Sequence, residues 1–266
     1  MEFVTGQGTS LAYDDRGPSD GLPVVLVHGH PFDRTMWNPQ AEALVRAGHR
    51  VIAADLRGYG DSEVVPGRTL LADFADDTAE LLDHVGVGRA VVGGLSMGGQ
   101  IAMEFHRLHG ARVAALVLAD TSPVAETEDG RVLRNRMADR LLAEGMDGYA
   151  AEVIGRMIAP YNVTGLPDVA AQVLGMMRAT APEGAAAALR GRAERPDHRE
   201  SLAGARVPVL IVVGADDTYT PVPDAEAMHR LVPHSELVVV GGAGHMPNLE
   251  RPEEFNAALL EFLARL

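Results

Sequence analysis

A serine between two glycines is the first place where this sequence could do chemistry. Gly94, Ser96 and Gly98 form the pattern G-x-S-x-G, directly after a short β-branched run and directly before a helical pattern. In such a strand-to-helix turn a bulky residue at either glycine would clash, and the serine hydroxyl projects beyond the edge of the sheet. The first amides of the helix, that of Met97 among them, then point at whatever the oxygen attacks. We therefore predict that Ser96 is a nucleophile.

A serine hydroxyl needs a base to accept its proton, and the base needs a carboxylate to orient it. Histidine is the side chain best matched to the first task at neutral pH, and His245 follows the last strand-like run of the chain. Asp216 and Asp217 follow an earlier strand, and Asp120 ends another one, so each is a candidate for the acid. The order serine, aspartate, histidine along the chain is the one expected for a sheet of this kind.

Other polar residues have alternative interpretations. His28 and His30, with Asp33 nearby, could suggest a metal site, but no third conventional ligand follows at a convincing spacing, so we predict no metal. Arg57 and Asp61 lie in a glycine-rich loop, where such residues more often stabilise a turn by local hydrogen bonds. We expect most other histidines at the surface, among them His49, His106, His109, His198 and His229.

The elements that must position these residues alternate between strand-like and helix-like patterns, which is typical of an α/β fold with a mostly parallel sheet. Ligands of such sheets lie beyond the carboxyl ends of the strands, where the marked residues fall. We predict an antiparallel lead-in from residues 2–5 and 11–15, then strands at 23–28, 50–55, 90–94, 113–120, 206–214 and 236–240. Helices are expected at about 36–47, 70–85 and 252–266, and another begins just after Ser96.

A long stretch without any strand pattern interrupts the sheet. We predict a core of residues 1–123 and 200–266, and a helical cap of residues 124–199 inserted between two strands. The cap reads as four helical segments, broken near Gly145, near residues 160–167 and at Pro182. It is rich in alanine, arginine and methionine, which suggests an adaptable apolar lid, although methionines at helical spacing are more often plain core.

Together the motifs resemble those of the α/β-hydrolase fold superfamily, in its capped serine-hydrolase form with an eight-stranded sheet. The resemblance spans essentially the whole chain and implies Ser96 as nucleophile, Asp217 as acid and His245 as base. It also implies an oxyanion hole from the backbone N–H groups of His30 and Met97, with no metal and no organic cofactor. The motifs are His28-Gly29-His30-Pro31, Asp55-x-Arg57-Gly58-x-Gly60-x-Ser62, Gly94-x-Ser96-x-Gly98, Gly214-x-x-Asp217-x-x-x-Pro221 and Gly244-His245.

The expected function is hydrolysis of a carboxylic ester or lactone of a small, mainly apolar substrate through an acyl-enzyme on Ser96. The opening loop and the serine turn resemble those of 3-oxoadipate enol-lactonases, small carboxylesterases and cofactor-independent haloperoxidases (perhydrolases). We expect Trp37, Met137, Met157 and Met246 to line the substrate pocket. Two other functions stay open: a C–C hydrolase or lyase with the same triad, and a small-molecule binding protein without catalysis.

Composition limits the partners. The chain carries 37 acidic and 23 basic residues, a formal net charge of −14, so we expect no nucleic-acid partner. No apolar run reaches the roughly 20 residues that cross a bilayer, so we expect no membrane partner. The beginning of the chain lacks the pattern of a signal peptide, and there are no cysteines. These features favour a cytoplasmic protein, and the sequence does not indicate an oligomeric state.

Overall fold

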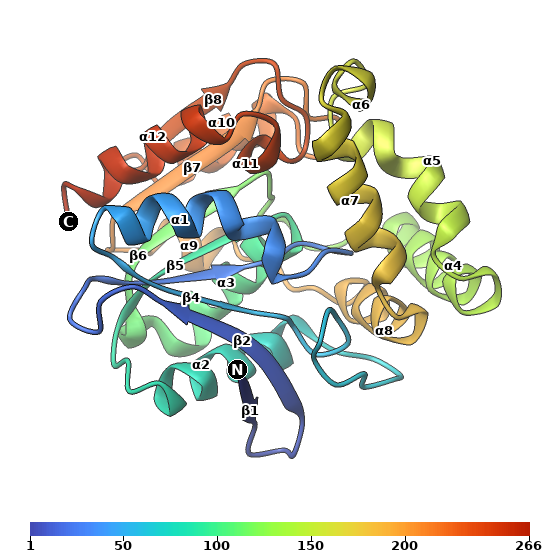
Figure 1. Ribbon diagram of the computed structural model, residues 1–266, viewed down its shortest axis with the longest axis horizontal. Coiled ribbons are helices and arrows are strands. Elements are labelled where there is room, and N and C mark those ends of the chain that lie inside the picture. Colours follow the sequence, from blue (N-terminus) through green and yellow to red (C-terminus); the bar gives the residue numbers. More distant parts are fainter.

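The computed structural model describes residues 1–266 and contains one eight-stranded sheet with helices on both faces (Figure 1). The strand order is β1-β2-β4-β3-β5-β6-β7-β8. The pairs β1–β2 and β2–β4 are antiparallel and all other pairs are parallel, which confirms the predicted α/β sheet and its lead-in hairpin. The strands are β1 (Glu2–Val4), β2 (Ser10–Arg16), β3 (Pro23–Val27), β4 (Arg50–Ala54), β5 (Ala90–Leu95), β6 (Val113–Ala119), β7 (Val209–Gly214) and β8 (Glu236–Val240).

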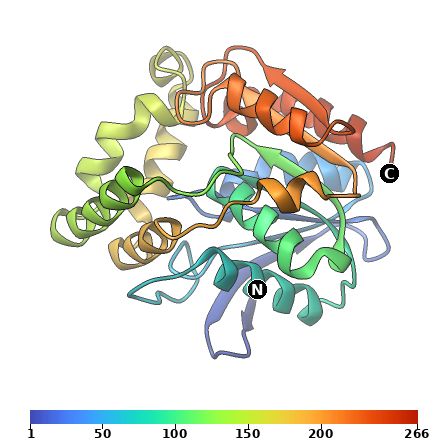
Figure 2. The same cartoon turned by 180° about the vertical axis from the view of Figure 1, so that it is seen from behind.

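Side chains of the central strands alternate between two hydrophobic cores. In β3, Val24 and Leu26 belong to one core and Val25 and Val27 to the other, as the two-residue period of a strand requires. The first face is covered by α1 (Asn38–Arg46) and α12 (Pro252–Leu263), which contact each other. The opposite face, seen in Figure 2, is covered by α2 (Leu71–His84), α3 (Met97–His109), α9 (Arg199–Ala203) and α10 (Val222–Leu231). Short helices are η1 (Arg34–Trp37), η2 (Gly110–Arg112) and α11 (Pro247–Glu250).

The parallel strands end together at one edge of the sheet. In the strand register Val27 lies beside Gly94, Ala119 beside Leu95 and Val212, and Gly214 beside Val240. The loops that follow β3, β5, β6, β7 and β8 therefore meet at this edge. These loops carry the candidate residues named above, although His30 and His245 are 215 positions apart in the sequence.

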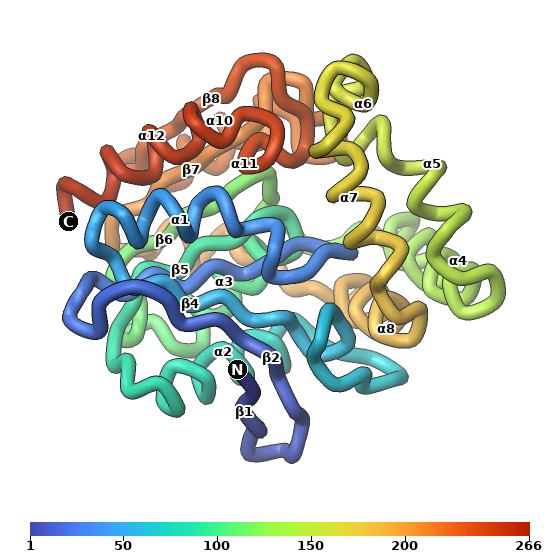
Figure 3. Tube along the Cα trace, in the orientation of Figure 1, coloured from blue at the N-terminus to red at the C-terminus, as the bar shows by residue number.

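Five helices lie between β6 and α9 and pack as a group beyond this edge, as the chain trace in Figure 3 shows. Gly145, at a φ of 76°, ends the first of them, and Pro167 and Pro182 begin the fourth and fifth. No strand occurs between residues 124 and 199, as predicted, but a short extra helix occupies the break at 160–167. The helices are α4 (Glu128–Glu144), α5 (Asp147–Met157), α6 (Asn162–Gly165), α7 (Pro167–Ala179) and α8 (Pro182–Arg192).

None of the helices is both long and apolar enough to pass through a membrane. The expected cytoplasmic location, the absence of a nucleic-acid partner and the division into core and cap stay predictions.

Candidate active site

Ser96 occupies a tight turn between β5 and α3, with φ 57° and ψ −115°. A positive φ costs a non-glycine residue about 1–3 kcal/mol, so the surrounding structure must hold it. A Cβ atom on Gly94 would lie 2.2 Å from the carbonyl carbon of Gly98, and one on Gly98 would lie 2.1 Å from the carbonyl oxygen of Val27. The two glycines therefore allow the helix to begin against the sheet, and this packing sets the position of the serine.

His245 and Asp217 form a buried pair beside this turn. His245 Nδ1 lies 2.7 Å from Asp217 Oδ2, and the carboxylate also accepts hydrogen bonds from the Tyr219 N–H (2.7 Å) and the Thr220 hydroxyl (2.6 Å). Burial alone would raise the pKa of Asp217, but the charge of His245 and these hydrogen bonds lower it to about 2. The ionised carboxylate accepts from Nδ1–H, so Nε2 of a neutral His245 carries the free lone pair that a general base needs.

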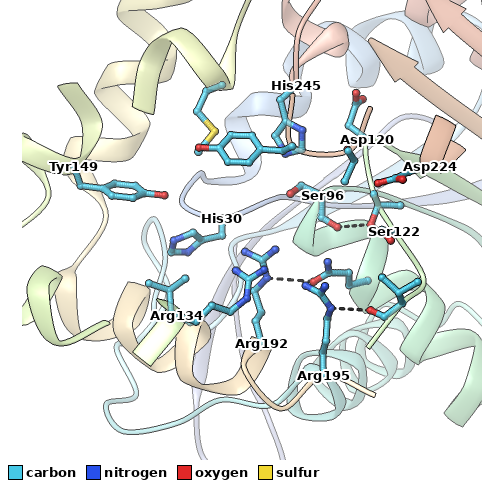
Figure 4. A pocket seen from close by; sticks show the side chains of 17 residues that line it. His30, Ser96, Asp120, Ser122, Arg134, Tyr149, Arg192, Arg195, Asp224 and His245 are labelled. Carbon is cyan, nitrogen blue, oxygen red and sulfur yellow. Dashed lines mark hydrogen bonds between the residues drawn. The ribbon is translucent and has the colours of Figure 1, made fainter. Parts of the chain in front are cut away.

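Ser96 and His245 line the same cavity, and Figure 4 shows the two side chains at one side of it. They are not hydrogen-bonded to each other. In enzymes without substrate this contact is often long, and it shortens when substrate binds.

The other two candidate acids occupy different environments. Asp216 is exposed and accepts a hydrogen bond from the Tyr161 hydroxyl. Asp120 is buried and accepts from the Gly214 N–H (2.9 Å), and its second carboxyl oxygen has no partner. Burial and the nearby charge of Asp217 raise the pKa of Asp120 well above its ordinary value, which disfavours the charged form of this carboxyl. Of the three candidates, only Asp217 is hydrogen-bonded to His245.

Two backbone N–H groups next to the serine are free to bind an oxyanion. Met97 is the first residue of α3, so its N–H has no partner within the helix. The N–H of His30 donates to no backbone carbonyl. The loop that carries it passes close to the serine, because a Cβ atom on Gly29 would lie 3.4 Å from Ser96 Cβ. Free N–H donors beside an attacked carbonyl stabilise a tetrahedral oxyanion, and this role of His30 and Met97 stays a prediction.

The pair His28 and His30 does not form a metal site. His28 Nδ1 is hydrogen-bonded to the Gly29 carbonyl (2.9 Å), and its Nε2 accepts from the Leu56 N–H (2.9 Å). No nitrogen lone pair of His28 is therefore left for a metal. The His30 Nδ1 is engaged by the Tyr59 hydroxyl at 2.8 Å.

The cavity has a volume of about 300 Å³, and its lining differs from the expected one. Met157 lies on its wall, as expected, but Trp37, Met137 and Met246 do not. Trp37 packs on Phe255, with ring centroids 6.2 Å apart, because α1 lies against α12. Met246 is fully buried in the core on that face, and Met137 packs against the same core. These three residues therefore pack in or against the core rather than line the pocket, contrary to our prediction.

Three arginines that the sequence did not single out line the cavity, namely Arg134, Arg192 and Arg195. Glu126 forms ion pairs with Arg134 and, at 3.1 Å, with Arg195. The wall is therefore more polar and more positively charged than the mainly apolar pocket we expected. The spacing of Leu189 and Arg192 is a signal for one of them, since it places the arginine on the buried face of α8.

Two further expectations concern residues outside the cavity. His198 is buried rather than exposed, because the chain returning from α8 passes over α3 and the imidazole bonds to the buried Glu104 at 2.8 Å. Burial opposes ionisation of Glu104, but contacts with His198 and Arg107 lower its pKa to about 2. Arg57 forms a buried ion pair with Asp77, which supports a structural role for its loop.

Known proteins resemble this chain over nearly its full length. The family model described as alpha/beta hydrolase fold matches residues 23–252. The chain is 30% identical to 3-oxoadipate enol-lactonase 1 of Acinetobacter baylyi, over 94% of this chain and 91% of that protein.

Two solved structures show the same likeness. A thermophilic esterase from Thermogutta terrifontis, with malate bound, is 41% identical with a TM-score of 0.95, over 99% of this chain and 96% of that chain. The enol-lactonase from Burkholderia xenovorans LB400 is 26% identical with a TM-score of 0.92, over 99% and 100% of the two chains. The chain therefore belongs to the α/β-hydrolase fold family, and it is a hydrolase similar to those that act on carboxylic esters and lactones.

Proposed function

We propose that this protein hydrolyses small carboxylic esters or lactones through an acyl-enzyme on Ser96. His245 Nε2 accepts the proton of the Ser96 hydroxyl as the oxygen bonds to the substrate carbonyl carbon, and Asp217 stabilises the imidazolium that forms. The C–O bond to the leaving alcohol then breaks, and His245 returns the proton to the departing oxygen. Water, deprotonated by His245, attacks the acyl-enzyme, so that the acid is released and the Ser96 hydroxyl is restored.

The observation that carries this proposal is the His245–Asp217 hydrogen bond of 2.7 Å beside the cavity that also holds Ser96. The free N–H groups of His30 and Met97 support it, because removal of one such donor typically costs about 10²–10³ in turnover. The similarity to an enol-lactonase and an esterase favours the same bond type here.

Helices α4 to α8 act as the cap of this site in our proposal, and residues 1–123 and 200–266 form the core. Tyr149 and Met157 of α5, Arg134 of α4 and Arg192 of α8 contribute directly to the cavity wall. A closed wall would exclude bulk water from the oxyanion and would limit substrates to small molecules.

Hydrolysis of p-nitrophenyl butyrate tests the proposal. We expect turnover by the wild type and its loss by at least about 10⁴-fold in Ser96→Ala, as for removal of other serine nucleophiles. Ser122→Ala is the matched control, because Ser122 lines the same cavity on a different loop and has no role in the proposed reaction. Equal activity of Ser96→Ala and the wild type would refute the mechanism. Failure to cleave any ester, with cleavage of a C–C bond instead or with binding alone, would favour the alternative functions.

A further inference from the structure

Arg192 is a buried arginine without an acidic partner. It lies at the end of α8, and its only hydrogen bond to the protein runs from Nε to the Gln100 side chain at 3.2 Å. The two terminal nitrogens of the guanidinium have no partner, and Arg192 lines the cavity that holds Ser96 (Figure 4). Arginine is the residue best suited to bind a carboxylate through two parallel hydrogen bonds.

The surrounding charges do not neutralise this guanidinium. Glu126, the nearby acid, is already paired with both Arg134 and Arg195. Burial and the positive charges of these two arginines lower the pKa of Arg192 well below its ordinary value, which shows how unfavourable its charge is without a partner. A buried charge without a partner is strongly unfavourable. An anion that binds beside Arg192 would supply the missing partner, so its binding is favoured.

The acids on the cavity wall do not supply the missing charge. Asp120 accepts from the Gly214 N–H and forms no hydrogen bond with Arg192, and its raised pKa disfavours its charge. In Figure 4 Asp224 lies beside Ser122, on the other side of Ser96 from His30.

His30 provides a second donor without a partner. Burial raises the pKa of the Tyr59 phenol, so its hydroxyl stays protonated, and His30 Nδ1 is its only hydrogen-bond partner. Burial and nearby positive charges lower the pKa of His30 well below its ordinary value, so the ring is neutral. Nδ1 therefore accepts from Tyr59 and the proton lies on Nε2, which is buried, unpartnered and part of a cavity-lining residue.

The guanidinium lies within a short substrate's length of the serine. Gln100, which holds Arg192 Nε, is one helical turn from Ser96, and its N–H donates to the Ser96 carbonyl at 3.1 Å. One turn of helix rises about 5.4 Å. Ser96 and Arg192 line one cavity of about 300 Å³, so a substrate that reaches both groups is a small molecule whose two functional groups lie a few carbons apart.

We propose that Arg192, with the Nε2–H of His30, binds a free carboxylate of the substrate. The substrate class is then an ester or lactone that carries a second, unesterified carboxylate a few carbons from the bond that is cleaved. This inference rests on the proposed function, because it names the substrate class of the same site. It replaces the mainly apolar substrate that the sequence suggested.

The test compares two esters that differ only in the free carboxylate. Monomethyl glutarate carries it, and dimethyl glutarate has it masked as a second methyl ester. Proton release in a pH-stat gives kcat/KM for each ester with the wild type, Arg192→Gln and Arg190→Gln. Arg190 is the matched control, because it lies on the same helix but forms an exposed ion pair with Asp139.

We expect the wild type and Arg190→Gln to hydrolyse monomethyl glutarate with the higher kcat/KM. In Arg192→Gln the ratio of the two kcat/KM values should fall by about 10–100-fold, which is the loss expected when a hydrogen bond to a charged group is removed. A general structural defect would lower both rates and leave their ratio unchanged. Arg192→Lys keeps the charge but not the paired geometry, so it should restore part of the preference. An unchanged ratio in Arg192→Gln overturns the inference, even where both esters are hydrolysed.

Binding of glutarate tests the carboxylate site without turnover. We expect glutarate at millimolar concentration to raise the melting temperature of the wild type and of Arg190→Gln. In Arg192→Gln the Kd for glutarate should increase at least about tenfold. If neither ester were hydrolysed but glutarate binding depended on Arg192, the proposed function would fail and the carboxylate site would stand. Glutarate binding that is equal in Arg192→Gln and the wild type contradicts the site.

Discussion

Replacing Asp217 by asparagine tests whether Asp217, rather than the adjacent Asp216, is the acid that acts on His245. The environment of Asp217 lowers its pKa from 3.8 to about 2. That difference corresponds to about 2–3 kcal/mol in favour of the ionised carboxylate, or on the order of 10²-fold in an equilibrium constant. If the same interaction stabilises the imidazolium during the reaction, Asp217→Asn loses at least this factor in kcat.

A change in the tautomer of His245 would increase that loss. An asparagine amide group can donate to His245 Nδ1, which would put the proton on Nε2 and remove the lone pair that accepts the Ser96 proton. In serine proteases a change of this kind costs about 10⁴ in kcat. We therefore expect a loss between about 10²-fold and 10⁴-fold for Asp217→Asn, measured as initial rates with p-nitrophenyl butyrate at pH 7.5.

Asp216→Asn is the matched control. Asp216 is exposed and bonds to Tyr161, so we expect a rate within about threefold of the wild type, as for most exposed substitutions. Circular dichroism and melting temperatures establish that both variants are folded. Near wild-type kcat in Asp217→Asn, or an equal loss of activity in the two variants, would refute the role of Asp217 as the acid that acts on His245.

Three other predictions follow from the same region. Gly98→Ala should unfold readily or fail to accumulate, because its Cβ would lie 2.1 Å from the Val27 carbonyl oxygen, and urea denaturation checks this. Glu250→Ala should lower the free energy of unfolding by about 2–6 kcal/mol, because Glu250 accepts from the buried N–H groups of Gly244 and Ala159, each at 2.8 Å. The kcat of Glu250→Ala should also fall, because Gly244 is next to His245 in the chain. An unchanged kcat would show that Glu250 does not help to position His245. The pKa of Asp217 is lowered in the folded state, so its contribution to stability is present above about pH 4 and is lost as the pH falls through about 2. Urea titrations between pH 2 and pH 7 should show that the wild type and Asp217→Asn differ in their free energy of unfolding, and that this difference decreases only below about pH 4.

The sequence predicted the part of the site that local geometry dictates. Ser96 lies in a turn that its neighbouring glycines define, so three positions of sequence suffice to place it. His245 and Asp217 follow strands whose parallel register brings their ends together, and this register follows from the hydrophobic pattern. The choice between Asp216 and Asp217 could not be made from residue types alone, because the two differ only in the side to which the loop turns them.

The pocket could not be predicted in the same way. Which helical side chains face the serine depends on how α4 to α8 rotate and pack, and hydrophobic spacing does not fix that rotation for a polar wall. Trp37 and Met246 are apolar residues close in sequence to functional loops, yet both are buried in the core on one face of the sheet. Arg192 lies in an alanine-rich helix, where only its spacing from Leu189 indicates that it faces inward. His198 lies in a loop, and its burial depends on the contact with Glu104 of α3.

The central claim is that Ser96 is the nucleophile, and the most direct test is to find which residue forms a covalent adduct with a serine-hydrolase probe. Incubation with a fluorophosphonate probe, followed by digestion and peptide mass mapping, identifies the side chain that attacks. We expect one labelled residue, Ser96, with labelling lost in Ser96→Ala and strongly slowed in His245→Ala. A label on another residue, or no label on a folded protein that still hydrolyses p-nitrophenyl butyrate, would contradict it.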